Sequence, residues 1–155
     1  VSVHQFRQAD FVDKVRHALQ AHGASPSRLK LEITESMFAG DLENIIQKMN
    51  RLKSHGVGFS LDDFGTGYSS LSYLTRLPID CVKIDRSFIR DVPGNEDATA
   101  IVRAIVALAH SLRLTTVAEG VETAEQRDFL RALGCDEMQG FLGGQPVFAE
   151  AMVCP

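Results

Sequence analysis

Two adjacent aspartates, Asp62 and Asp63, end a strand-like segment and precede the loop Gly65-Thr66-Gly67. Carboxylates this close repel each other, so a pair that stays ionised needs a cation or a base nearby. An isolated Asp-Asp pair is most often a solvated turn. Here the other strand-like segments also bring a charged or amide residue to the corresponding point, which favours a shared site. Its further candidate members are Glu32, Lys83, Glu119 and Gln139.

These candidates point to a metal site built from oxygen ligands. Glu32, Asp62 and Lys83 each alternate with apolar neighbours, so we expect them on the face turned away from the helices. Oxygen ligands without histidine or thiolate suit Mg²⁺ or Mn²⁺ rather than zinc. Several carboxylates can hold two such ions about 3.5–4 Å apart, an arrangement that clamps a phosphodiester. Lys83 would stabilise transition-state charge or orient the attacking water. Alternatively, it only pairs with Asp62 or Asp85.

Other catalytic chemistries find little support in the sequence. Ser69-Ser70 lacks the GxSxG pattern and a nearby histidine, so a serine nucleophile is not indicated. The five histidines are isolated and the three cysteines lie far apart without CxxC spacing, which indicates neither a zinc site nor a disulfide framework. These residues are His4, His17, His22, His55, His110, Cys81, Cys135 and Cys154.

The composition indicates one soluble domain. The chain has 155 residues, of which 45% are hydrophobic and 23% charged. Its formal net charge of -4 provides no basic field, so we expect neither DNA nor RNA as a partner. We see no run of 18 apolar residues and no signal peptide. We therefore expect a cytoplasmic domain, attached to a membrane only through other domains of a parent protein.

Hydrophobic periodicity predicts strands that alternate with helices. Such alternation is typical of βαβ units and a parallel sheet. An open doubly wound sheet is one possibility, but its GxGxxG fingerprint is missing. A polar residue at every strand end favours an α/β fold of the TIM-like (β/α)8 barrel type. A whole barrel needs about 250 residues, so we expect it to be N-terminally incomplete. The five strands are expected near 29–34, 57–63, 81–85, 115–119 and 137–141.

The expected helices have recognisable start and stop signals. They run from Asp10 to Gly23, from a cap at Asp41 to Gly56, and over 69–77. A long helix follows the turn at 93–95, and Thr123 with Gln126 forms a capping box for a helix that ends at Leu133. The chain starts at Val1 without methionine and, in this interpretation, without a cap signal.

Five motifs stand out along the chain: Leu31-Glu32-Ile33-Thr34-Glu35, the loop from Asp62 to Leu71, Lys83-Ile84-Asp85, Val117 to Glu122, and Gln139-Gly140-Phe141. Together they resemble the EAL domain, the family of bacterial cyclic di-GMP phosphodiesterases. The resemblance covers Val1 to about Val147 in the family's order and spacing, and we assign 1–155 to the C-terminal two-thirds of one such domain.

The resemblance implies a TIM-like barrel with one antiparallel strand that hydrolyses cyclic di-GMP to linear pGpG with Mg²⁺ or Mn²⁺. It implies Asp62 as the ligand that bridges two metal ions, and Lys83 as the residue that holds the catalytic water. Glu119 is implied in catalysis as well as in metal binding, and Glu35 as the anchor of the Asp63-to-Ser70 loop. The implied metal ligands are Glu32, Asp62, Asp63 and Glu119; the implied substrate-binding residues are Gln139 and Glu122.

The sequence departs from the family pattern at its start. Val1 to Phe6 resembles the segment that follows a metal-binding asparagine, and neither that asparagine, the Glu-Ala-Leu signature nor the arginine-bearing substrate strand is present. We therefore expect a longer natural protein, and weak or absent turnover by these 155 residues alone. Family analogy also suggests a homodimer through the 63–77 loop and helix. The alternatives are a non-catalytic cyclic di-GMP receptor, since N-terminal metal ligands are missing, and a structural interaction module.

Overall fold

A single parallel sheet organises the chain. The computed structural model describes residues 1–38, 41–65 and 74–148. The strands are β1 (Lys30–Thr34), β2 (Gly58–Phe64), β3 (Cys81–Ile84), β4 (Thr115–Glu119) and β5 (Glu137–Gln139), and neighbours in the sheet follow chain order. A doubly wound sheet would reverse its strand order at a switch point. The sequential order is the winding of a (β/α) barrel, which confirms the predicted α/β class.

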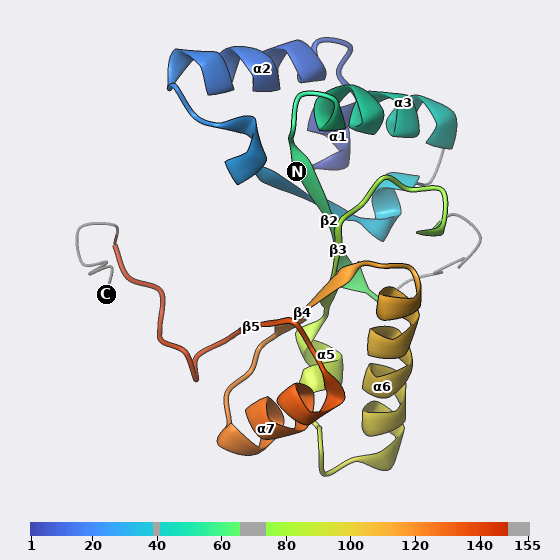
Figure 1. Cartoon of the computed structure of the whole chain (residues 1–155), viewed down its shortest axis with the longest axis vertical. Helices are drawn as coiled ribbons and strands as arrows, with labels where there is room; N and C mark the ends of the chain where they lie inside the picture. The colour runs from blue at the N-terminus through green and yellow to red at the C-terminus, as the bar shows by residue number, and fades with distance from the viewer. Residues whose placement is uncertain (39–40, 66–73, 149–155) are drawn as a thin grey trace.

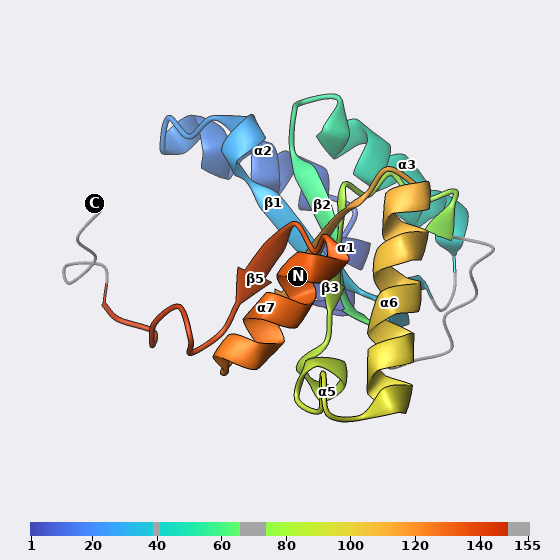
Figure 2. The same cartoon turned by 60° about the horizontal axis from the view of Figure 1, so that its bottom comes forward.

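Helices cover the two halves of the sheet separately (Figure 1). α1 (Val3–Arg7), α2 (Phe11–Ala21) and α3 (Leu42–Lys53) lie beside β1 and β2, with the short 3₁₀ turns η1 (Pro26–Arg28) and η2 (Glu35–Phe38). α5 (Arg86–Ile89), α6 (Glu96–Ser111) and α7 (Ala124–Leu133) lie beside the other strands, and Figure 2 shows α6 and α7 from a second side. None of the described helices is long and apolar enough to cross a membrane.

Most predicted elements form within one or two residues of their expected limits. Asp41, Asn95 and Thr123 cap α3, α6 and α7 with their side chains, and Gln126 completes the predicted capping box. The helix expected over 69–77 lies largely outside the described residues. The 3₁₀ turns and α5 are elements that the sequence analysis did not assign.

The start of the chain does carry a cap signal, so the expectation of none was wrong. Ser2 Oγ accepts a hydrogen bond from the Gln5 backbone N–H, and Gln5 Oε1 accepts one from the Ser2 N–H. This reciprocal pair satisfies two otherwise unbonded donors of a one-turn helix. Lys48 of α3 donates to the carbonyls of residues 6, 7 and 8 at the other end of α1, at 2.9–3.0 Å. α1 is thereby held at both ends.

The last strand is shorter than expected, ending at Gln139 rather than at residue 141. A Cβ at Gly140 would lie 2.2 Å from the Val121 carbonyl oxygen, so only glycine fits against that backbone. Val121 then donates to the Gln139 carbonyl and accepts from the Leu142 N–H, both at 3.1 Å. The chain turns around Val121 instead of continuing the ladder.

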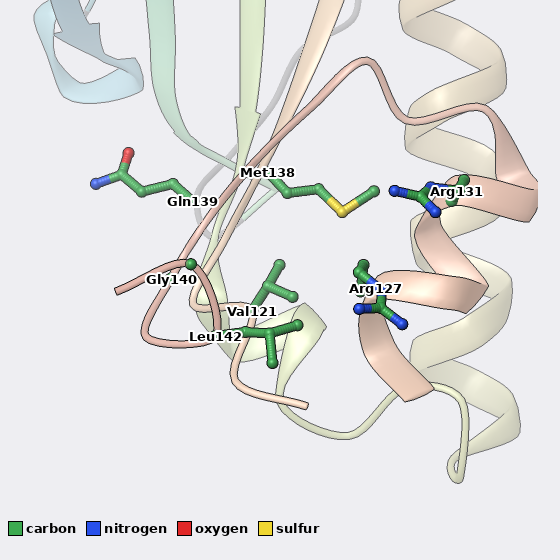
Figure 3. A pocket seen from close by; sticks show the side chains of 8 residues that line it. Val121, Arg127, Arg131, Met138, Gln139, Gly140 and Leu142 are labelled. Carbon is green, nitrogen blue, oxygen red and sulfur yellow. The ribbon is translucent and has the colours of Figure 1, made fainter. Parts of the chain in front are cut away.

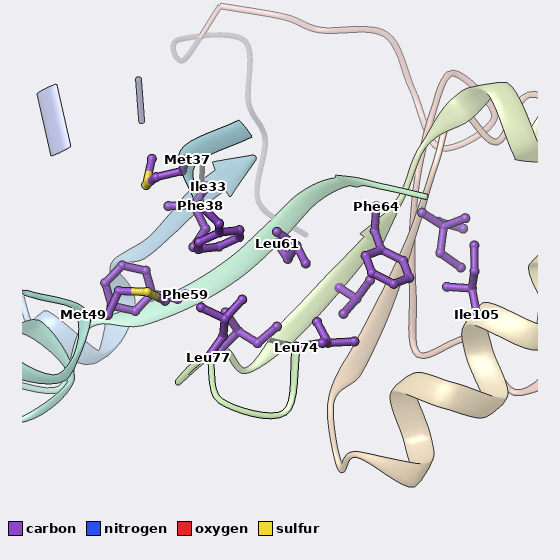
Figure 4. Packing of buried hydrophobic residues seen from close by; sticks show 14 of the residues in the cluster. Ile33, Met37, Phe38, Met49, Phe59, Leu61, Phe64, Leu74, Leu77 and Ile105 are labelled. Carbon is purple, nitrogen blue, oxygen red and sulfur yellow. The ribbon is translucent and has the colours of Figure 1, made fainter. Parts of the chain in front are cut away.

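A continuous hydrophobic cluster joins the helices to the sheet (Figure 4). Phe59 of β2 and Met49 of α3 are fully buried, and the ring of Phe6 in α1 packs against that of Phe11 in α2, with the ring centroids 4.9 Å apart and the planes tilted by 44°. Burying each such side chain contributes about 1.5–3 kcal/mol. Phe64, at the end of β2, belongs to the same cluster as Ile105 of α6. The apolar face of the sheet is therefore fixed, and the polar residues between these positions face the opposite side.

Asp136 connects the last two strands to α6. Its Oδ2 accepts hydrogen bonds from the Thr116 N–H at 2.8 Å and the Thr116 hydroxyl at 2.7 Å, and lies 3.1 Å from His110 Nε2. Partial burial alone would raise the pKa of Asp136. The hydrogen bonds from Thr116 and the contact with His110 outweigh this effect, and the pKa of Asp136 therefore lies below its ordinary value.

We expect Asp136→Asn to lower the free energy of unfolding at pH 7 by about 1 kcal/mol, because a neutral amide accepts these hydrogen bonds less strongly. A carboxyl group whose pKa is lower in the folded than in the unfolded state stabilises the fold at pH values above its unfolded-state pKa of about 3.9. That stabilisation is lost as the pH falls through the folded-state pKa. Urea unfolding at pH 7 and near pH 3 should therefore show that the difference in unfolding free energy between the wild type and Asp136→Asn is smaller at the acidic pH. Asp128→Asn, at an exposed carboxylate, should leave the unfolding midpoint almost unchanged. A deficit for Asp136→Asn that is equal at both pH values would contradict this account.

Candidate metal centre and active site

A buried lysine gathers carboxylates from three other strands. Lys83 of β3 is 7% exposed, and its Nζ lies 2.6 Å from Glu119 of β4, 2.9 Å from Glu32 of β1 and 3.0 Å from Asp62 of β2. An ammonium group has three donors, and here each faces a different carboxylate. Four neighbouring strands therefore contribute to one polar centre, as the strand-end pattern predicts.

The charge of Lys83 holds this centre together. Burial alone would lower the pKa of Lys83, but the adjacent carboxylates of Glu119, Glu32 and Asp62 together raise it above its ordinary value. The lysine is therefore a permanent cation at neutral pH. It offsets the mutual repulsion of carboxylates that are otherwise partly withdrawn from water.

Asp62, Asp63 and Glu119 form a group with metal-binding geometry. One carboxylate oxygen from each lies within 4.8 Å of the others. Consecutive residues of a regular strand point to opposite faces, so neighbouring aspartates would not normally meet. Asp63 has a φ of 55°, and the β2–β3 register shifts between Leu61 and Phe64. This irregularity redirects Asp63 toward the side of the sheet that Asp62 already faces.

The donor set of this group fits a hard divalent cation. All three members offer carboxylate oxygens, which Mg²⁺ and Mn²⁺ prefer. Burial raises the pKa of Asp63, and repulsion from Asp62 and Asp85 raises it further, while Lys83 lowers it less. A bound cation would relieve that repulsion. Glu32 contacts Lys83 but is not part of this three-carboxylate group within the described residues.

Glu35 and Gln139 lie where they can support the same centre. Glu35 Oε1 accepts a hydrogen bond from the Gly65 N–H at 3.1 Å, at the start of the loop after β2. Residues 66–73 of that loop lie outside the described parts of the chain, so the anchoring role stays a prediction. Gln139 is in register with Glu119, and its side chain points away from Met138 and the α7 arginines (Figure 3). Register partners on parallel strands share a face, which places Gln139 on the side of Glu119.

Glu122 lies apart from the other predicted residues. It lines a separate hollow beside α5 with Arg86 and Arg90. The sequence analysis assigned no function to these arginines, because they lie on an element that it did not predict. The signal for that element is Asp85, whose Oδ1 accepts from the Ser87 N–H at 3.0 Å and so caps α5.

α5 packs closely on the loops that follow β2 and β4. A Cβ at Gly120 would lie 2.6 Å from Arg86 Cβ, and one at Gly65 would lie 3.0 Å from the Phe88 ring. Both glycines also have positive φ, at 70° and 95°. Glycine is therefore required at these two positions, next to Glu119 and two residues after Asp63.

The sequence pattern of the EAL domain matches residues 1–146. The chain is 51% identical over 153 residues to MucR of Pseudomonas aeruginosa, a bifunctional diguanylate cyclase/cyclic di-GMP phosphodiesterase, covering 99% of this chain and 22% of MucR. It is 48% identical over 140 residues to the cyclic di-GMP phosphodiesterase NbdA of the same species, covering 90% of this chain and 18% of NbdA.

Solved structures of such proteins share the fold. The phosphodiesterase PaMucR in complex with c-di-GMP superimposes with a TM-score of 0.93 at 51% identity, covering 99% of this chain and 62% of that chain. Klebsiella pneumoniae BlrP1, solved with cyclic di-GMP and calcium or manganese, gives 0.81 at 35% identity, covering 89% of this chain and 35% of that chain. The chain thus spans about a fifth of the curated relatives and 62% of the PaMucR structure.

Replacing Lys83 with a neutral residue should leave the repulsion between the surrounding carboxylates uncompensated. In metal-free protein we expect Lys83→Met to lower the free energy of unfolding by about 2–4 kcal/mol, because it leaves partly buried carboxylates without a counter-charge. Thermal unfolding with and without Mn²⁺ should show a larger stabilisation of the variant than of the wild type, since the ion supplies the missing charge. Lys14→Met, at an exposed pair with Asp10, should respond to Mn²⁺ as the wild type does. An equal response of Lys83→Met and wild type would refute this explanation.

Proposed function

Because the chain belongs to the EAL domain family, we propose that the protein carrying it is a cyclic di-GMP phosphodiesterase that hydrolyses the cyclic dinucleotide to linear pGpG. Residues 1–155 form part of one such domain in this proposal. The observation that carries it is the convergence of Glu32, Asp62 and Glu119 on Lys83, each from a different strand. MucR and NbdA, which share about half of its residues over the matched length, bear the phosphodiesterase activity in their names.

We assign metal binding to Asp62, Asp63 and Glu119, with Glu32 beside them. Divalent cations held there would act as Lewis acids and lower the pKa of a bound water. Mg²⁺ or Mn²⁺ is proposed from the oxygen-only donor set, and BlrP1 has been solved with manganese. Gln139 lies on the same side as Glu119 and is proposed to contact substrate there.

Lys83 has a direct role in this scheme. If Asp62 and Glu119 held cations, Lys83 would keep its charge, and its N–H donors would be available to a water or to a non-bridging phosphate oxygen. In the overall reaction the water oxygen forms a bond to phosphorus, the bond from phosphorus to one ribose 3′ oxygen breaks, and that oxygen takes up a proton. One ring opening thus yields a linear dinucleotide with a 5′-phosphate.

The hydrolysis test uses the full-length gene product that contains these residues. Incubation with cyclic di-GMP and Mn²⁺, followed by chromatography, should show pGpG as the product. Asp62→Asn should reduce turnover by more than about 100-fold, since loss even of an outer partner of a metal ligand typically costs 10–100-fold. Asp128→Asn, at an exposed carboxylate in the middle of α7, should retain wild-type turnover.

Three other outcomes would contradict the proposed hydrolysis or its metal site. Binding of cyclic di-GMP without turnover would indicate a receptor, and neither binding nor turnover would indicate an interaction module. Wild-type turnover by Asp62→Asn would contradict the metal assignment. The 155-residue chain measured in parallel is expected to show weak or absent turnover.

A further inference from the structure

The backbone at Asp63 has a conformation that residues other than glycine rarely adopt. Its φ of 55° lies in the left-handed region, where the side chain crowds the backbone. This conformation is what brings the Asp63 carboxylate to Asp62 and Glu119, because neighbours on a regular strand point to opposite faces. A left-handed residue persists only where the surrounding structure enforces it. The constraint on Asp63 comes from the contacts of the residues that directly follow it.

Gly65, two residues after Asp63, is held by both a hydrogen bond and an aromatic ring. Its N–H donates to Glu35 Oε1 at 3.1 Å. A Cβ built on Gly65 would lie 3.0 Å from Phe88 Cε2 and 3.7 Å from Ile105 Cδ1. The ring and the isoleucine methyl group therefore leave the Gly65 backbone little room to move. A change of φ at Asp63 would displace this backbone, so the contacts at Gly65 also restrain Asp63.

The helix that carries Phe88 meets the backbone beside two of the carboxylates. α5 begins directly after β3, and Phe88 packs on the loop after β2. At the other contact, a Cβ at Gly120 would lie 2.6 Å from Arg86 Cβ, directly after Glu119 at the end of β4. α5 is therefore a spacer between the end of β2 and the end of β4. Its position influences how close Asp63 and Glu119 come to each other.

We propose that Phe88 is a positioning residue of the metal centre, an inference that rests on the proposed metal binding. Its ring holds Gly65 in place and thereby keeps the Asp63 carboxylate turned toward the other two. A smaller side chain at this position gives the backbone after Asp63 more room. Asp63 then relaxes to a negative φ, and its carboxylate turns away from Asp62. The centre keeps Asp62 and Glu119 but loses its third oxygen ligand.

The proposal is tested by calorimetric titration of the full-length protein with Mn²⁺ in the absence of substrate. Phe88→Leu should weaken Mn²⁺ binding about 10-fold, as loss of a residue that orients a metal ligand does. Titration of Asp62→Asn identifies the binding that belongs to this centre. The matched control is Phe129→Leu, because Phe129 is also partly buried against the core but lies on α7. Both leucine variants should lower the metal-free unfolding temperature, whereas Phe129→Leu should bind Mn²⁺ as the wild type does.

A double-mutant comparison shows whether Phe88 acts through Asp63. In an Asp63→Asn background, Phe88→Leu should change the Mn²⁺ affinity by less than about twofold, because the ligand that Phe88 orients is already altered. Ile105→Val is a milder variant for the case that Phe88→Leu does not fold. It removes only the Cδ1 methyl group next to Gly65, and it should weaken Mn²⁺ binding by a smaller factor than Phe88→Leu.

The outcomes distinguish this proposal from the proposed function. Equal Mn²⁺ affinities of Phe88→Leu and Phe129→Leu would overturn the role of Phe88, and so would a further loss of about 10-fold in the Asp63→Asn background. If Phe88→Leu does not fold, wild-type affinity in Ile105→Val would overturn it. Wild-type protein that binds no Mn²⁺ at this centre would instead refute the metal assignment of the proposed function.

Discussion

The ion pairs of Lys83 are the constraint on which the site depends. Lys83 is almost completely buried on β3, and the carboxylates around it come from β1, β2 and β4. Desolvating an ammonium group is unfavourable unless opposite charges surround it, and bringing carboxylates together is unfavourable without a cation. The buried ammonium group therefore requires the carboxylates, and the carboxylates require the ammonium group. The strands must keep their register for the charges to meet.

Close backbone approaches keep the surrounding loops in place. α5 packs on Gly120 and Gly65 so tightly that a side chain at either position would collide with Arg86 or Phe88. Gln126 ties the other end of α5 to the loop after β4. The carboxylate-bearing residues at the ends of β2 and β4 and the hollow that contains Glu122 are thus parts of one connected edge of the sheet. A ligand at this edge meets groups whose positions are already set.

Two kinds of chemistry stand side by side at that edge. The centre around Lys83 has an excess of carboxylates, which suits cations and, through them, the phosphate of a substrate. The neighbouring hollow has guanidinium groups and one carboxylate, which suits a ligand with both acceptors and donors. Both arise from the same topology, because parallel strands in chain order deliver their carboxyl ends to one side.

The sequence by itself determined the α/β class, the five strands and the acidic strand-end residues, because period-2 hydrophobic patterns and capping signals act locally. It also placed Glu32, Asp62 and Lys83 on one face, since alternation along a strand decides the face. Tertiary structure decided the rest. Asp63 joins Asp62 only through a positive φ and a register shift. The packing of α5 on Gly65 and Gly120 and the end of β5 at Gly140 depend on contacts between distant segments. Such contacts leave no local pattern, because their energies come from residues far apart in the chain.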